Sequence, residues 1–220
     1  MKFSYSDALN NFQNGKINEA KEICEEILKS EPNNFNAYYL LGVIAFQTKK
    51  YVKSDDLISK AIEINPKNSE FYNFKGIALI HINKFEEAIE SWTKAIEIDP
   101  NSLDAYNNRG NALIKLKKNE LALKNFDQAL KLKPNFSQAL HNRSVVLKNL
   151  NRFEVALESV NKAIEINPKY VDAYNLKGVI LREINQIENS LNSYDKAIKL
   201  NPNFADVHLN RGNLLLNENK

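Results

Sequence analysis

The sequence predicts an all-α solenoid, a stack of antiparallel helix pairs that repeats every 34 residues. One observation is the spacing of helix-breaking residues. The six prolines are 34 residues apart, and five of the six glycines keep the same interval, with Ser144 in the vacant place. The other observation is that apolar residues recur three and four apart between the prolines, which is typical of amphipathic helices. A fixed period indicates repeated units that bury one another's apolar faces.

The unit 69–102 shows why one repeat predicts two helices. Asn83 and Lys84 separate two apolar-periodic halves, and Pro100 ends the second half because proline cannot continue a helix. We therefore expect two helices of roughly 12–14 residues joined by a short turn. Gly76 and Ala88 are small, so we expect the two backbones to approach each other at these positions.

The residues at fixed repeat positions resemble the tetratricopeptide repeat. Counted from residue 1, position 4 is mostly tyrosine, 8 glycine, 20 alanine, 27 alanine and 32 proline. The resemblance spans 1–220 as a single array. Its repeats are 1–34, 35–68, 69–102, 103–136, 137–170 and 171–204, and a lone helix follows at 205–220. It implies a right-handed superhelix that binds protein segments on its concave face. Repeat one departs most, with Ala8 and Ile27, as terminal capping repeats often do.

The bulk composition narrows the class of protein. Hydrophobic residues make up 43% and charged residues 26%, which is typical of a folded chain. The net charge of +3 does not predict nucleic-acid binding, and no apolar run has the length of a membrane span. The start of the sequence lacks the apolar stretch of a signal peptide, so we expect a cytoplasmic protein with no membrane partner.

The sequence predicts no enzyme, cofactor or metal site. His81, His141 and His208 belong to different repeats, which does not give the compact spacing of a zinc site. Cys24 is the single cysteine, and its apolar position predicts a core residue rather than a nucleophile. The glycines occur singly, so no phosphate-binding loop is predicted.

Candidate ligand contacts follow from the resemblance, which implies that first-helix positions 2, 5, 6, 9, 12 and 13 line the groove. In the N-terminal half these positions give an apolar and aromatic wall that includes Tyr39, Phe46 and Phe74. Such a wall suits the apolar side chains of a peptide or helix. The alternative is that Phe46 and Phe74 simply pack against the neighbouring repeat.

In the C-terminal half the same positions are polar. The asparagines are Asn107, Asn108, Asn111, Asn142, Asn175, Asn210 and Asn213, and the groove cations are Lys115, Lys148 and Arg182. An asparagine amide both donates and accepts, so a column of them can pair with a peptide backbone. This column resembles the asparagine ladder in the tetratricopeptide region of O-linked N-acetylglucosamine transferases. Because 33 of the 220 residues are asparagine, compositional bias is the alternative explanation.

Position 7 carries a row of cations: Lys75, Arg109, Arg143, Lys177 and Arg211. One interpretation is a strip for an acidic or phosphorylated partner. The favoured one is that each cation extends along its neighbours and pairs with an acid of a second helix, such as Asp127 or Asp195. The carboxylate clamp that holds heat-shock chaperone tails is not predicted, because position 5 is never lysine.

Three functions remain open on these observations. The leading one is a non-catalytic scaffold that binds a peptide or protein segment in its concave groove. The second is a substrate-recruiting arm of a larger glycosyltransferase or sulfotransferase. The third is a self-assembling oligomer, because the last helix is rich in leucine and lacks a second helix to cover it. That helix predicts either an array that continues past Lys220 or a contact surface.

Overall fold

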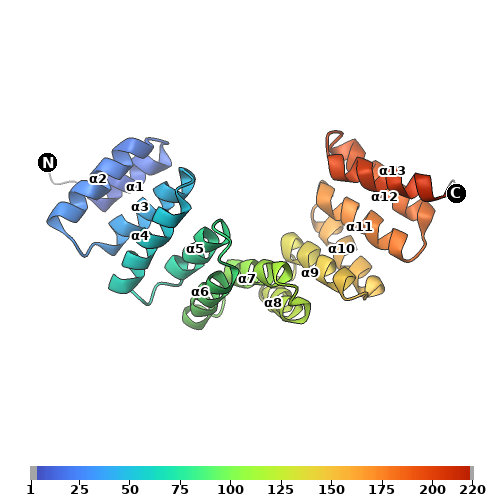
Figure 1. The fold of residues 1–220 in the computed structure, drawn as a ribbon, viewed down its shortest axis with the longest axis horizontal. Helices are drawn as coiled ribbons and strands as arrows, with labels where there is room; N and C mark the ends of the chain where they lie inside the picture. The colour runs from blue at the N-terminus through green and yellow to red at the C-terminus, as the bar shows by residue number, and fades with distance from the viewer. Residues whose placement is uncertain (1–3, 219–220) are drawn as a thin grey trace. The chain divides into compact units, whose positions relative to one another are not determined.

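A computed structural model describes residues 4–218 of the protein, with side chains up to residue 216. This part of the chain forms thirteen α-helices and contains no strand (Figure 1). Within each compact unit, helices pack mainly on their direct neighbours in the chain. The predicted all-α repeat solenoid is confirmed.

The chain divides into two compact units, Met1–Ala112 (unit 1) and Leu113–Lys220 (unit 2). Unit 1 contains α1 (Tyr5–Gln13), α2 (Ile17–Ser30), α3 (Phe35–Gln47), α4 (Tyr51–Ile64), α5 (Ser69–Ile80) and α6 (Phe85–Ile98). The unit boundary falls within α7 (Leu103–Lys115). Unit 2 contains α8 (Asn119–Leu132), α9 (Ser137–Asn149), α10 (Phe153–Ile166), α11 (Val171–Glu183), α12 (Ile187–Leu200) and α13 (Ala205–Glu218).

The helix bounds keep the period of the sequence. From α3 on, the odd-numbered helices (the first helices) begin 34 residues apart, and so do all the even-numbered ones (the second helices). Each second helix ends two residues before its proline, as at Ile98 and Pro100. Helix α1 has only 9 residues, whereas α2 to α13 have 12 to 14. The short helix therefore lies in the repeat whose sequence departs most from the pattern.

Each first helix up to α11 ends in the same left-handed turn. The residues with positive φ recur at the 34-residue interval: Gly15, Lys49, Asn83, Lys117, Asn151 and Asn185. At Lys117 the amide donates to the Ile114 carbonyl, and the next amide donates to the Leu113 carbonyl, both at 2.9 Å. This is the Schellman arrangement, in which glycine is preferred and asparagine is tolerated. Lysine occupies a strained backbone conformation there.

Within a helix pair, the position-8 glycine makes room for a bulky side chain at position 24. A methyl group added to Gly42 or Gly76 would lie 2.5 Å from Ile58 or Trp92, respectively. A methyl group on Gly178 would come still closer to the ring of Tyr194. Gly76 was expected to admit the backbone of the second helix at Ala88. The atoms nearest to the space beside Gly76 belong to the indole of Trp92, whose Nε1 donates to the Asn73 carbonyl at 3.1 Å.

A serine hydroxyl links positions 8 and 20 in three of the pairs. Ser54 donates to the Gly42 carbonyl at 2.8 Å, and Ser190 donates to the Gly178 carbonyl at 2.7 Å. Ser144 replaces the glycine of its repeat and donates in the opposite direction, to the Ala156 carbonyl at 2.8 Å. All three serines are fully buried, so these bonds satisfy hydroxyls that burial would otherwise leave without a partner. The serines therefore contribute a hydrogen bond between the two helices as well as a small side chain.

Replacing Lys49 or Lys117 with glycine is expected to stabilise the protein by about 0.5–1 kcal/mol each, because glycine adopts positive φ without the steric cost of a β-carbon. Urea denaturation would measure the change in free energy of unfolding. The matched reverse substitution is Gly15→Ala at φ 75°, which should destabilise by a similar amount. A loss of stability in both lysine variants would contradict this explanation of the turn.

Gly178→Ala is expected to destabilise unit 2 by about 1–3 kcal/mol, because the new methyl group overlaps the Tyr194 ring. Gly212→Ala is the matched control, since no atom of the described residues lies within 4 Å of the position that its methyl group would take. The control should be neutral or stabilising, as alanine favours a helix over glycine by about 1 kcal/mol. Thermal unfolding of both variants tests this, and equal melting temperatures would show that the contact is unimportant.

Candidate functional site

The first helices of unit 1 carry a cluster of aromatic side chains. Phe46 of α3 and Phe74 of α5 meet edge to face with ring centroids 5.4 Å apart, and Tyr39 lies 5.8 Å from Phe74. Tyr51, the first residue of α4, contacts Phe46 at 5.3 Å and stacks on His81 at 4.5 Å. We call these five residues the aromatic cluster. Tyr39, Phe46 and Phe74 are half-buried, so they pack on one another and keep part of their surface exposed.

Tyr39 is held in place by a hydrogen bond between neighbouring first helices. Its hydroxyl donates to Glu70 Oε1 at 2.8 Å. Burial and this bond to the carboxylate both raise the pKa of Tyr39, so the phenol remains protonated at neutral pH. The hydrogen bond therefore fixes the Tyr39 ring at one side of the aromatic cluster, with the Glu70 carboxylate beside it.

The sequence had placed Tyr39, Phe46 and Phe74 on one wall, and the structure brings these three together. Phe46 and Phe74 pack on each other across neighbouring repeats, as the packing alternative predicted, and each ring is still partly exposed. Contact of these rings with a ligand stays a prediction. The sequence did not predict that Tyr51 and His81 would belong to this aromatic wall. Tyr51 begins a second helix, and its approach to His81 follows from the turn geometry rather than from first-helix periodicity.

The asparagines of α7 differ in exposure. Asn107 is 5% exposed, whereas Asn108 and Asn111 are half-buried. A side chain as buried as Asn107 is poorly placed to contact a ligand, so Asn108 and Asn111 remain the candidates of this helix in unit 1. Lys115, at the end of α7 in unit 2, is exposed.

The first helices of unit 2 carry amide and imidazole groups. The Asn210 side chain donates to Asn175 Oδ1 at 2.9 Å, which joins α13 to α11. His141 of α9 lies 5.0 Å from the Tyr170 ring, and its Nδ1 atom is buried without a hydrogen-bond partner among the described residues. Burial lowers the pKa of His141, so the ring is neutral at pH 7.

The other candidates of unit 2 lie near these groups in the sequence. Asn142 and Lys148 are half-buried on α9, and Asn213 is exposed on α13. Arg182 forms an ion pair with Glu183 at 2.8 Å. No contact among the described residues joins Lys148 and Arg182 into one charged site.

Two of the position-7 cations pair with an acid of a second helix, as the favoured interpretation predicted. Arg143 donates to Asp127 at 2.7 Å and Arg211 to Asp195 at 2.6 Å. In each case the partner lies sixteen residues earlier, at position 25 of the preceding repeat. These bonds connect one repeat to the next.

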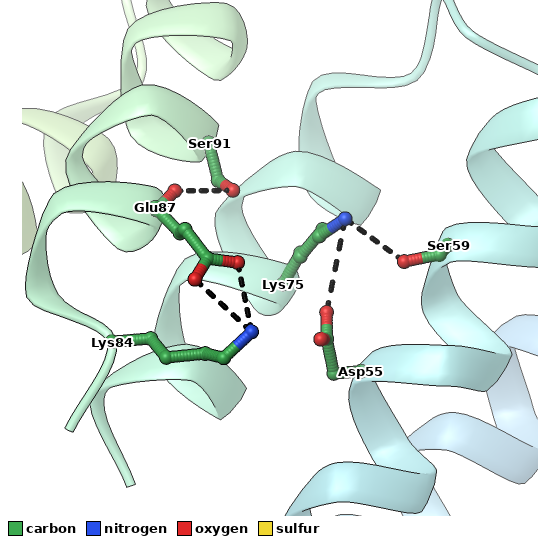
Figure 2. Close-up of polar contacts among 6 residues, drawn as sticks. All are labelled: Asp55, Ser59, Lys75, Lys84, Glu87 and Ser91. Carbon is green, nitrogen blue, oxygen red and sulfur yellow. Dashed lines mark hydrogen bonds and ion pairs between the residues drawn. The ribbon is translucent and has the colours of Figure 1, made fainter. Parts of the chain in front are cut away.

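Hydroxyl groups replace the acid at position 25 of the second and third repeats. Lys75 donates to Ser59 Oγ at 2.9 Å and lies 3.8 Å from Asp55, and Arg109 donates to Thr93 at 3.1 Å. Figure 2 shows Lys75 pointing at Ser59 and Asp55, with Glu87 and Lys84 paired nearby. Burial raises the pKa of Asp55, and the positive charge of Lys75 opposes this shift. The sequence predicted only acidic partners for these cations.

Other chemical features of the described residues can be stated briefly. Cys24 is fully buried, which raises the pKa of its thiol to about 12 and confirms the predicted core role. Within residues 4–218 no three His, Cys, Asp or Glu side chains gather as a metal-binding group would. The helices described here are all too short or too polar to cross a bilayer.

Models of the tetratricopeptide repeat match residues 76–117, 103–136, 137–170, 160–191 and 178–218. Residues 13–95 match the model of subunit 3 of the anaphase-promoting complex, or cyclosome. No curated protein matches the chain.

Several solved structures share the fold. PilF of Pseudomonas aeruginosa is 17% identical with a TM-score of 0.81, and 95% of each chain is covered. YrrB, described as a TPR protein with an unusual peptide-binding site, is 21% identical with a TM-score of 0.69, covering 84% of this chain and 95% of its own. In the Cut9–Hcn1 tetramer of the anaphase-promoting complex, a chain 16% identical gives a TM-score of 0.76, covering 97% of this chain and 42% of its own.

Proposed function

Because the chain belongs to the tetratricopeptide-repeat family, we propose that it is a non-catalytic scaffold that binds a peptide segment of a partner protein on its first helices. The observation that carries this proposal is the aromatic cluster of unit 1. Its rings are fixed by mutual contacts, so the scaffold loses little side-chain entropy when a partner binds. Partly exposed aromatic side chains are the groups that most often dominate binding energy at protein interfaces.

The polar groups of unit 2 support backbone recognition. The Asn175–Asn210 bond uses one oxygen lone pair and one N–H, so each amide keeps further donors and acceptors for a peptide bond. The column resembles the asparagine ladder of O-linked N-acetylglucosamine transferases. YrrB, which has the same fold, is described as having a peptide-binding site. We therefore expect unit 1 to bind apolar side chains of a peptide and unit 2 to bind peptide backbone groups.

The peptide proposal can be tested by selecting binders from a random peptide library on the whole chain. We expect Phe46→Ala and Phe74→Ala each to weaken the selected peptides at least about tenfold, as truncation of an aromatic anchor typically does. Val52→Ala is the matched control, because Val52 is 62% exposed on α4 and lies outside the aromatic cluster. Isothermal titration would give the affinities, and circular dichroism would confirm that each variant is folded.

A second pair of substitutions separates the polar contribution. Asn108→Ala combined with Asn142→Ala should weaken the same peptides more than Glu90→Ala on the second helix α6. If Phe46→Ala, Phe74→Ala and the double variant Asn108→Ala with Asn142→Ala all bind as the wild type does, the first helices do not form the peptide site.

Self-association through α13 is a second candidate function, because this helix exposes two large apolar side chains. Leu209 is 63% and Leu216 65% exposed, whereas Val207 and Leu214 on the same helix are buried. We expect multi-angle light scattering to show a mass that rises with concentration, and Leu209→Glu with Leu216→Glu to abolish the rise. A monomeric mass at every concentration would reject this candidate.

A further inference from the structure

A hollow of about 480 Å³ lies around Lys177, between the second helices α10 and α12 of unit 2. Lys177 comes from α11 beneath them, and Tyr174 and Leu181 form apolar parts of the wall. The polar lining includes Lys196, Asn161 and Asn192. None of its lining residues belongs to the proposed peptide site.

Two equivalent hollows show what normally surrounds a position-7 cation. The one beside Lys75, about 470 Å³, is lined by Glu87 and Glu90 (Figure 2 shows Glu87), and Lys75 also reaches Asp55. The one beside Arg143, about 710 Å³, is lined by Asp127 and Glu158. In both cases the position-7 cation forms an ion pair with a carboxylate of the protein itself, Lys75 with Asp55 and Arg143 with Asp127.

The hollow around Lys177 contains no such carboxylate. Its lining has two lysines and no acid, and position 25 carries Asn161 where Asp127 and Asp195 bind the arginines of other repeats. Within residues 4–218, neither Lys177 nor Lys196 makes an ion pair or a side-chain hydrogen bond. The amides of Asn161 and Asn192 are likewise without a partner there.

We propose that this hollow is a binding site for a phosphate-type oxyanion. Two ammonium groups and two amide N–H₂ groups supply the charge and the several donors that a tetrahedral anion accepts from different directions. Lysine acts as a point charge toward phosphate, whereas planar carboxylates are matched by the arginine fork, which this lining lacks. The anion would take the place of the carboxylate that the other hollows contain. The site does not depend on peptide binding by the first helices.

The proposal is tested by titrating the whole chain with inorganic phosphate at constant ionic strength, with chloride as the balancing anion. We expect saturable binding by calorimetry and a higher melting temperature in phosphate, since a ligand that binds only the folded state stabilises it. Asn161→Asp should reduce the affinity at least tenfold while raising the melting temperature without phosphate, because the new carboxylate pairs with Lys177. Lys177→Met should also reduce the affinity at least tenfold.

Lys75→Met is the matched control and should keep the wild-type affinity for phosphate. O-phospho-L-serine, compared with L-serine, distinguishes a phosphoryl group presented on another molecule from free phosphate. Saturable binding of inorganic phosphate or of O-phospho-L-serine supports the site. The absence of saturable binding, wild-type affinity in Asn161→Asp, or equal binding of acetate would each overturn the proposal.

Discussion

Each helix pair depends on a close contact between a small residue on its first helix and a larger one on its second. At Gly42, Gly76 and Gly178 the absent methyl group is the space that Ile58, Trp92 or Tyr194 fills. Where position 8 is larger, position 24 is smaller, as for Ala8 with Cys24 and Ser144 with Val160. Because interiors are close-packed, the two positions must vary together. This contact turns two amphipathic helices into one rigid repeat, whose outward faces are then free to vary.

The position-7 cations provide the next level of organisation, between repeats. A cation and its partner sixteen residues earlier join a first helix to the preceding second helix, with partly buried side chains at Arg143 and Lys75. Such pairs orient neighbouring repeats more than they stabilise them, since partly exposed ion pairs contribute roughly 0–1 kcal/mol. The presence of Asn161 at position 25, in place of the aspartate of other repeats, therefore costs little stability. The same position can serve packing in one repeat and ligand binding in another.

The sequence predicted what depends on local spacing. Prolines end second helices, Asn83 lies in the turn between two helices, and Cys24 lies in the core. It also predicted the acidic partners of Arg143 and Arg211, because the repeat register places positions 7 and 25 on facing helices.

Contacts that depend on the distance between neighbouring repeats could not be read from one unit. The stacking of Tyr51 on His81, the burial of Asn107 and the Asn175–Asn210 bond all arise from how closely successive helices approach. Periodicity assigns these residues to a face, but exposure on that face is decided by the bulk of their neighbours. The first-helix side chains of unit 1 are consequently aromatic and mutually packed, whereas those of unit 2 present amides and a neutral imidazole. Apolar ligand groups therefore suit the first helices of unit 1, whereas hydrogen-bonding groups suit those of unit 2, because a buried polar side chain needs a polar partner and an aromatic ring does not.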